Sequence, residues 1–263
     1  MQHSEFPRVV DAQWLSAHLG DLDLVVGDVR GPNAHMRGHI PGSRPLVLGS
    51  PPPGADAGSV AELAKEVALR LRRHGITGEE RLVLVDRGDG VGAMPAVQMA
   101  ELAGHRKVAV LLGGVAAWPG ELAQGAVELE PVREASLEPN ARAFPTRQEL
   151  AARLGDPTLT ILDVRREEEY TGKAGNACDP RQGHIPGARR LQLDALFGAD
   201  RMPKPAAEIR ALVGEAEEIV AYCHSGSRSA LATLALRSAG YDARNYAGSW
   251  HEWSRHDDLP LET

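Results

Sequence analysis

The stretch that decides the fold is 219–229, which reads Ile219-Val220-Ala221-Tyr222-Cys223-His224-Ser225-Gly226-Ser227-Arg228-Ser229. A short apolar run ends in a cysteine, and a loop of small polar residues follows at once. The next residues, 230–239, have the composition of a helix, and Gly240 stands where a left-handed helix cap is expected. The stretch therefore predicts a buried strand, a tight turn and a helix, with Cys223 at the carboxyl end of the strand.

The same landmarks occur twice along the chain. In the second half, an apolar run with Asp163 and Arg165 precedes a Gly-His-Ile-Pro-Gly segment at 183–187. In the first half, a run with Asp28 and Arg30 precedes the same five residues at 38–42. Gly113-Gly114 and Trp118 correspond to Gly248-Ser249 and Trp253. Two copies this far apart indicate tandem domains and not a solenoid. We expect a first domain at 1–127, a linker rich in Pro, Glu and Arg at 128–144, and a second domain at 145–263.

Short apolar runs alternate with helical patterns within each half. Residues 82–85, 159–164 and 219–222 are typical of buried strands. Thr146 and Ser59, each followed three residues later by Glu, fit capping boxes that open helices. This alternation predicts an α/β fold in which helices flank a parallel sheet on both faces. Ligands of such sheets bind at the carboxyl ends of the strands, which is where Cys223 falls.

Composition and charge exclude several classes of function. The chain has 263 residues, of which 43% are hydrophobic and 25% charged, as in soluble globular proteins. No apolar run approaches the ~20 residues of a membrane span, so no membrane partner is expected. The first eight residues lack the apolar core of a secretory signal, which favours a cytoplasmic location. A net charge of −7 argues against a nucleic-acid partner.

The two cysteines, Cys178 and Cys223, suggest a nucleophile more than a disulfide. The loop after Cys223 can direct several backbone N–H groups at one point, and the following helix adds its positive dipole end. Arg228 adds a fixed cation with a planar set of donors. This arrangement suits a thiolate or persulfide on Cys223 and an incoming oxyanion. The alternative is a buried structural cysteine followed by an ordinary helix cap. Cys178 is either a resolving thiol or a spectator.

The paired Gly-His-Ile-Pro-Gly segments and the Cys-x-x-Gly-x-Arg-Ser loop resemble the rhodanese family. The duplicated layout and the segment Tyr246–Trp253 resemble its tandem thiosulfate and 3-mercaptopyruvate sulfurtransferases. The resemblance implies two tandem rhodanese-like domains with about five parallel strands each, and neither a metal nor an organic cofactor. It implies persulfide chemistry on Cys223. Asp86 stands at the corresponding place of the first half, and a carboxylate cannot carry sulfur, so that half should be inactive.

The candidate site falls into three groups. Cys223 is the expected nucleophile. The expected substrate-binding residues are His224, Ser225, Gly226, Ser227, Arg228, Ser229 and Arg181. For His224 the alternative is a solvent-facing residue, and for Arg181 it is a guanidinium that binds carbonyl groups. Structural support is expected from Asp163, Arg165 and Trp250. His39 and His184 are expected to be turn residues, because no second ligand has zinc spacing.

The sulfur donor is expected to be thiosulfate, a small anion that a positive loop would attract. Enzymes that use 3-mercaptopyruvate resemble one another in arginines that hold the carboxylate. Here Arg181 matches one of them, but Glu169 takes the place of the other and would repel a carboxylate. The acceptor is a thiophilic group: cyanide, a thiol or a carrier protein.

Two rival functions remain open from the sequence. A cysteine-based phosphatase or arsenate reductase on this fold has five residues between Cys and Arg, whereas four separate Cys223 from Arg228. A non-catalytic binding module would lack a competent nucleophile.

Overall fold

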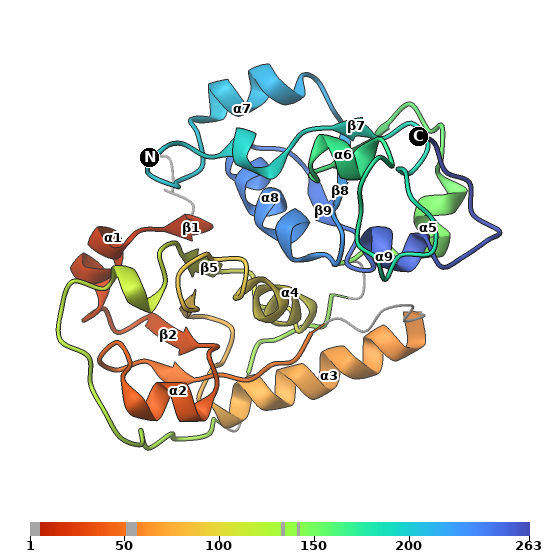
Figure 1. The fold of residues 1–263 in the computed structure, drawn as a ribbon. Coiled ribbons are helices and arrows are strands. Elements are labelled where there is room, and N and C mark those ends of the chain that lie inside the picture. The colour runs from red at the N-terminus through yellow and green to blue at the C-terminus, as the bar shows by residue number, and fades with distance from the viewer. Residues whose placement is uncertain (1–5, 51–56, 133–134, 141–142) are drawn as a thin grey trace. The chain divides into compact units, whose positions relative to one another are not determined.

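A computed structural model describes residues 6–50, 57–132, 135–140 and 143–263 (Figure 1). The chain divides into two compact units, one made of residues up to 50 with 58–141, the other of 142–263 with 51–57. Residues 1–5 of the N-terminus lie outside the described part, as do 133–134 and 141–142 of the expected linker. Among the described residues, no helix has the length and apolar character needed to cross a bilayer.

The first unit contains a five-stranded parallel sheet in the order β1-β5-β4-β2-β3. Its strands are β1 (Val9–Val10), β2 (Leu24–Asp28), β3 (Arg44–Pro45), β4 (Arg81–Val85) and β5 (Val108–Leu111). Its helices are α1 (Ala12–His18), α2 (Pro32–Arg37), α3 (Ala57–Arg73), α4 (Met94–Leu102) and the 3-10 turn η1 (Val115–Ala117).

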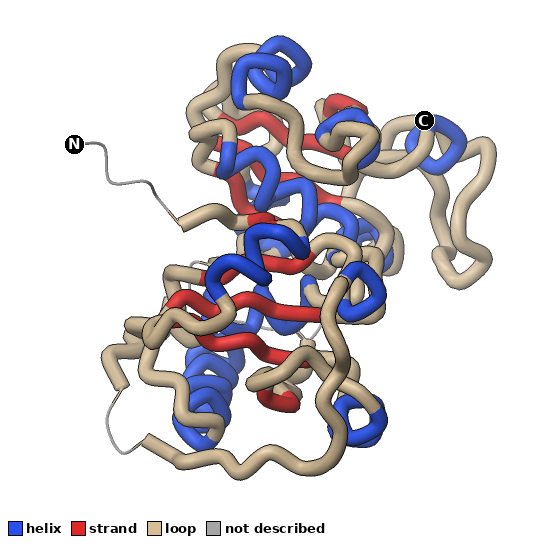
Figure 2. Tube along the Cα trace, turned by 90° about the vertical axis from the view of Figure 1, so that its left-hand side faces the viewer, coloured by secondary structure: helices blue, strands red, loops and turns tan. Residues whose placement is uncertain are grey.

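The second unit contains a four-stranded parallel sheet in the order β7-β6-β8-β9. Its strands are β6 (Leu159–Asp163), β7 (Arg189–Arg190), β8 (Glu218–Tyr222) and β9 (Ala243–Asn245). Its helices are α5 (Arg147–Ala152), α6 (Glu167–Tyr170), η2 (Leu193–Leu196), α7 (Ala206–Val213), α8 (Ser227–Ser238) and α9 (Ser249–Trp253). In Figure 2 the strands of each unit run side by side among helices. The expected α/β fold is confirmed.

Strand β8 shows why both faces of the second sheet are covered. Successive side chains of a strand point to opposite faces. Ile219 and Ala221 pack into a cluster with apolar residues of α7 and α8, and Cys223 belongs to the same cluster. Val220 and Tyr222 pack on the other face, in a cluster that holds the tryptophans of α9 and Leu150 of α5. An apolar strand without alternation is the sequence that such two-sided burial requires.

The two predicted capping boxes have different outcomes. Thr146 caps α5 as expected: its side chain accepts the N–H of Glu149, whose carboxylate accepts the N–H of Thr146. The predicted cap at Ser59 is wrong, because α3 begins at Ala57 and residue 59 already lies inside the helix. Ser and Glu three residues apart also fit a first helical turn, so spacing alone does not locate the cap.

Three residues of the expected linker at 128–144, Val132, Ser136 and Asn140, hydrogen-bond to elements of the first unit. The N–H of Ser136 donates to the carbonyl of Thr77 at 2.9 Å, and that of Asn140 donates to the carbonyl of Leu102 at 2.8 Å. A stretch without helix or strand is thus held by the backbone of that unit.

Candidate active site

Cys223 follows β8 directly, and its thiol faces the start of α8. The N–H of Gly226 donates to Cys223 Sγ at 3.2 Å, and α8 begins at the next residue. Gly226 has φ of +89°, and a Cβ there would lie 2.4 Å from the carbonyl oxygen of Ala247. Only glycine fits this position without displacing backbone. The turn therefore aims an N–H dipole and a helix N-terminus at a sulfur that is 1% exposed.

A second turn, at 245–251, holds the cysteine loop from beneath. The N–H of Cys223 donates to Ser249 Oγ at 3.1 Å, and the N–H of Trp250 donates to the carbonyl of Cys223 at 3.1 Å. Asn245 Nδ2 donates to the carbonyl of Gly226 at 3.0 Å. These contacts fix the backbone on both sides of the sulfur.

Sequence reasoning missed the role of Ser249, although the repeat carries a signal for it. Ser249 adopts φ of +53°, which is unusual for a residue with a side chain. Its counterpart Gly114 adopts φ of +52°. In the first unit the N–H of Val115 donates to the carbonyl of Asp86, as Trp250 does to Cys223. Both units therefore use the same turn, and the second has a hydroxyl where the first has none.

Arg165 links three parts of the site. Its guanidinium donates to both carboxylate oxygens of Asp163, at 2.6 to 3.0 Å, and to the carbonyl of Gly183 at 2.7 Å. It also lies over the rings of Tyr222 and Trp250, at 5.5 and 4.8 Å from their centroids. Arg165 is 1% exposed, and a buried cation needs such partners. It joins the end of β6, the Gly-His-Ile-Pro-Gly segment and the floor of the cysteine loop.

Arg228 is not the free cation that the sequence suggested. Its two terminal nitrogens donate to the two carboxylate oxygens of Glu169, at 3.0 and 2.9 Å. The hydrogen bond to Glu169 and the nearby Cys223 thiolate raise the pKa of Arg228. Burial is the largest single effect and opposes ionisation of Glu169, but the bond to Arg228, the N–H of Arg166 and the nearby guanidinium charges together lower the pKa of that carboxyl. Glu169 was expected only to repel a carboxylate; instead it neutralises the loop's arginine.

Arg181 binds backbone carbonyl groups, which was the alternative to its expected role in substrate binding. It donates to the carbonyls of Trp253, Ser254 and Leu259 at 2.8 to 3.0 Å, and also to that of His256. Its donors are used by the segment that follows α9, so we do not carry Arg181 into the proposed substrate site.

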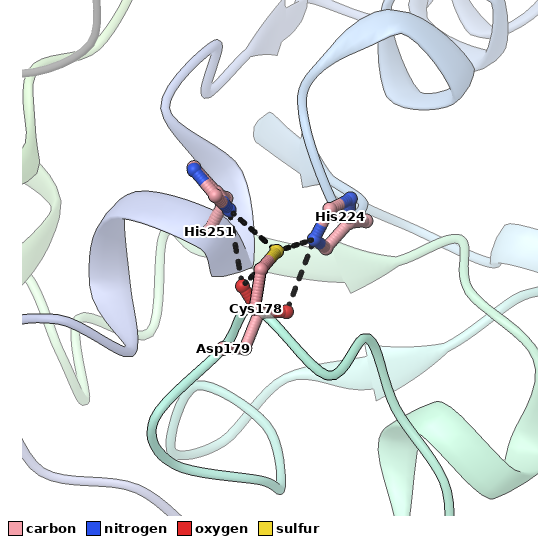
Figure 3. A group of neighbouring side chains, drawn as sticks. All are labelled: Cys178, Asp179, His224 and His251. Atoms are coloured by element: carbon pink, nitrogen blue, oxygen red, sulfur yellow. Dashed lines mark hydrogen bonds and ion pairs between the residues drawn. The ribbon is translucent and has the colours of Figure 1, made fainter.

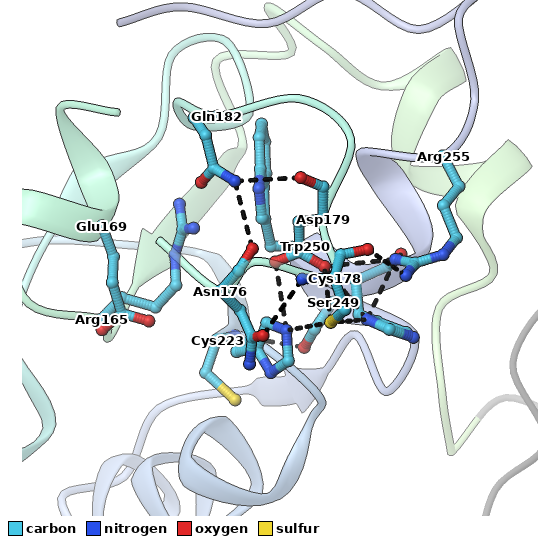
Figure 4. Close-up of polar contacts among 12 residues, drawn as sticks. Arg165, Glu169, Asn176, Cys178, Asp179, Gln182, Cys223, Ser249, Trp250 and Arg255 are labelled. Carbon is cyan, nitrogen blue, oxygen red and sulfur yellow. Dashed lines mark hydrogen bonds and ion pairs between the residues drawn. The ribbon is translucent and has the colours of Figure 1, made fainter. Parts of the chain in front are cut away.

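The remaining loop residues divide between solvent and backbone. Ser225 is exposed, Ser227 is half-buried, and Ser229 is buried with its hydroxyl donating to the carbonyl of Gly226. His224 is not simply solvent-facing, because its Nε2 lies 3.1 Å from Asp179 Oδ2 and 3.8 Å from Cys178 Sγ. Figure 4 shows Cys178 and Asp179 in the same region as Cys223, with no interaction drawn between the two sulfur atoms. Both cysteines are free thiols.

His39 and His184 were expected to be turn residues, but each forms an isolated antiparallel β-bridge, with Ala123 and Glu262, just before the Pro-Gly turn. His39 stacks on His35 and His184 on Tyr170, each pair with ring centroids 3.7 Å apart. Each ring nitrogen Nδ1 contacts the carbonyl oxygen of its stacking partner's residue.

The first unit has a carboxylate at the corresponding place. Asp86 is 4% exposed and accepts the N–H of Gly88 at 2.9 Å. Burial and the neighbouring Asp89 raise the pKa of Asp86 to about 6. The loop also differs in length, because α4 begins at Met94, whereas α8 begins at Ser227, directly after the short cysteine loop. The N–H of Gly88, two residues after Asp86, reaches its carboxylate, whereas the N–H that reaches Cys223 comes three residues later and directly before a helix.

Comparison with known proteins agrees with this duplicated geometry. The description of a rhodanese-like domain matches twice, at residues 11–121 and 146–256. The chain belongs to the rhodanese family. It is 32% identical to a probable 3-mercaptopyruvate sulfurtransferase of Pseudomonas aeruginosa, over 97% of this chain and 98% of that protein. It is 29% identical to a thiosulfate sulfurtransferase of the same organism, over 98% of each. The solved structure of wild-type EanB shares the fold, with a TM-score of 0.78 at 23% identity, over 97% of this chain and 69% of the other.

Proposed function

We propose that this rhodanese is a sulfurtransferase in which Cys223 carries the transferred sulfur as a persulfide, and that its donor is thiosulfate. The observation that carries the proposal is the N–H of Gly226, 3.2 Å from Cys223 Sγ at the start of α8. A donor at that distance stabilises negative charge on sulfur, both on the thiolate that attacks and on the persulfide that results. The sulfurtransferase names of the full-length relatives point to the same chemistry.

The reaction proceeds in two displacements. The Cys223 thiolate attacks the outer sulfur of thiosulfate, a sulfur–sulfur bond forms, and the original bond breaks with its electron pair leaving on sulfite. A thiophilic acceptor then attacks the outer sulfur of the persulfide. When cyanide is the acceptor, thiocyanate leaves and the thiolate is restored. No proton transfer is needed in either step, which fits a site whose contact with the sulfur is the N–H of Gly226.

Thiosulfate is favoured as donor by how the arginines are used. A 3-mercaptopyruvate carboxylate needs a cation with free donors, and Arg181 spends its donors on backbone carbonyls. The sulfonate end of thiosulfate requires only N–H and hydroxyl donors, which the loop Ser225–Ser229 supplies. The loop does not attract thiosulfate by a net positive charge, because Glu169 balances Arg228.

3-Mercaptopyruvate is the second candidate donor. One observation favours it: the 32% identical relative is named a probable 3-mercaptopyruvate sulfurtransferase. Arg228 is 31% exposed, so it can turn from Glu169 to a substrate carboxylate. In that case the carboxylate of Glu169 binds Arg228 only until the carboxylate of the substrate replaces it.

The test is steady-state transfer of sulfur to cyanide, with both donors measured on one preparation. A larger kcat/KM for thiosulfate supports the proposed donor, and a larger value for 3-mercaptopyruvate transfers the assignment to the second candidate. Cys223→Ser should abolish turnover with either donor and leave the circular dichroism spectrum unchanged. Turnover that survives in Cys223→Ser would refute the persulfide mechanism.

Two further measurements address the rival functions. Mass spectrometry after a thiosulfate pulse should show one added sulfur on Cys223, which a non-catalytic module would not acquire. Hydrolysis of p-nitrophenyl phosphate should be negligible, because the loop is one residue shorter than the Cys-x5-Arg loop of phosphatases.

A further inference from the structure

A second set of reactive side chains lies next to the cysteine loop. Cys178, Asp179, His224 and His251 bring one sulfur, one carboxylate and two imidazoles to a common point (Figure 3). One ligand atom from each lies within 4.8 Å of all the others. The residues come from three segments: the loop before Gly-His-Ile-Pro-Gly, the cysteine loop and α9. All belong to the second unit.

The spacing of these atoms is that of a tetrahedral metal site. Zinc binds sulfur at about 2.3 Å and nitrogen or oxygen at about 2.0–2.2 Å, so the ligand atoms stand about 3.3–3.6 Å apart. Cys178 Sγ lies 3.8 Å from His224 Nε2 and 3.6 Å from His251 Nδ1. The two oxygens of Asp179 lie 3.1 Å from the same two nitrogens. The two short contacts of Asp179 involve different oxygens, and the four ligand atoms lie within 4.8 Å of one another, so the side chains must draw closer together to close around an ion.

The carboxylate of Asp179 supplies an independent observation. Asp179 is 6% exposed, and its Oδ2 is buried without a hydrogen bond of acceptable geometry, although His224 Nε2 lies nearby. A buried carboxylate oxygen without a donor is costly. Oδ2 faces His224 and the cluster in Figure 3, where a cation would satisfy it. The other oxygen, Oδ1, already contacts His251 and Arg255.

From this geometry we propose that Cys178, Asp179, His224 and His251 bind a zinc ion. One thiolate, one carboxylate and two neutral imidazoles form a donor set that suits Zn²⁺. The thiol of Cys178 loses its proton to solvent on binding. The site is separate from Cys223, which lies in the apolar cluster on the side of α7 and α8.

Arg255 is the group that competes with the ion. Its Nη1 lies 3.2 Å from Asp179 Oδ1 and 3.0 Å from His251 Nδ1. Zinc must take the Nδ1 lone pair from this guanidinium. The Arg255 side chain is 37% exposed, so it can turn to solvent or remain on Oδ1 while Oδ2 binds the metal. The thiolate and carboxylate together give the site two negative charges against this one positive charge.

Zinc binding to the full chain tests the proposal. Chelator-stripped protein is titrated with Zn²⁺ against a chromogenic chelator, in the wild type and in Cys178→Ala, His251→Ala and Cys223→Ser. We expect one ion per chain in the wild type and in Cys223→Ser, with affinity at least about tenfold lower in Cys178→Ala and His251→Ala. With Co²⁺ as the probe, a thiolate-to-cobalt absorption band should appear in Cys223→Ser and be absent in Cys178→Ala.

Each contrary result overturns the site. Failure of the wild type to bind zinc stoichiometrically would mean that the four side chains form only a hydrogen-bonded network. Binding retained in Cys178→Ala but lost in Cys223→Ser would place the metal on the catalytic thiol. Both replaced side chains lie at least partly in solvent, so metal-free unfolding midpoints should match the wild type and exclude misfolding as the cause. Because the readout is metal binding, it is independent of the proposed sulfur transfer.

Discussion

Glu169 and Arg228 form a bidentate ion pair across 59 residues of sequence, joining α6 to the first turn of α8. Parallel N–H to oxygen bonds of this kind are the strongest geometry available to an arginine and a carboxylate. The pair places a carboxylate, as well as a guanidinium, beside the cysteine loop. If the donor binds at this loop, as proposed, its affinity should depend on the balance between the two residues.

Replacing Glu169 by Gln should strengthen the binding of anionic donors. The substitution keeps the side-chain shape, removes the negative charge and releases the guanidinium of Arg228. We expect the KM for thiosulfate to fall about three- to tenfold, equivalent to a gain of about 1 kcal/mol. Steady-state kinetics measure it. Glu168→Gln is the matched control, because Glu168 is exposed on the same helix. An unchanged KM in Glu169→Gln would show that the pair does not face the donor.

Replacing Arg228 by Ala should have the opposite effect, because it leaves the carboxylate of Glu169 without its partner. The KM for thiosulfate should rise about tenfold. The double variant Arg228→Ala with Glu169→Gln should have a KM that differs from the product of the two single effects, since each substitution removes the other residue's partner. Full additivity of the two single effects would contradict coupling between the residues.

Replacing Ser249 by Ala should destabilise the second unit. The change leaves the buried N–H of Cys223 without its acceptor, which costs about 1–3 kcal/mol. Urea denaturation followed by tryptophan fluorescence reports it, because Trp250 and Trp253 lie in the core of that unit. Ser225→Ala is the control, since Ser225 is exposed and should change stability by less than about 0.5 kcal/mol. Equal stability of the two variants would argue against the hydrogen bond.

Replacing Asp86 by Asn should stabilise the first unit at neutral pH. The pKa of Asp86 is raised to about 6, chiefly by burial, so the folded chain holds a proton that the unfolded chain has already lost. Folding stability then falls as pH rises from about 4 to about 6, by at most about 3 kcal/mol. Asn cannot ionise and avoids this loss.

Denaturation at two pH values checks the sign of this effect. We expect Asp86→Asn to be about 1–2 kcal/mol more stable than the wild type at about pH 7.5, with little difference at about pH 4. Asp257→Asn serves as control, because Asp257 is 98% exposed. If Asp86→Asn were instead more stable than the wild type at about pH 4 and not at about pH 7.5, the pKa of Asp86 would not be raised in the folded protein.

Local pattern was enough to predict the strands, the loop and the helix that follows it. Buried strands β4, β6 and β8 fall within a residue of the apolar runs, and α8 ends just before Gly240, which has φ of +91°. These features depend on neighbours a few residues away, so the sequence contains them directly. The ends of the domains, beyond the position of the repeats, stay a prediction.

Contacts between segments far apart in the chain could not be predicted from local sequence patterns. Whether Arg228 is free or paired depends on Glu169, and the fate of Arg181 depends on carbonyls more than 70 residues away. The candidate zinc site was not predicted from the sequence for the same reason. Its ligands come from three segments, whereas zinc sites recognisable in sequence have at least two ligands at short, regular spacing. Side-chain contacts that depend on the tertiary fold produce no periodic pattern in the sequence.

The unequal lengths of the two equivalent loops bear on how the duplicated chain diverged. Exchanging Asp86 for Cys would restore a thiol to the first unit, but α4 begins only at Met94, well past the place where α8 starts after Cys223. The restored sulfur would lie near the N–H of Gly88 in a longer loop, and not near an N–H that stands directly before a helix, as that of Gly226 does. Regaining activity there would require a deletion together with a point mutation. Under the proposed mechanism, two separate changes therefore stand between the first unit and a loop that could carry sulfur as Cys223 does.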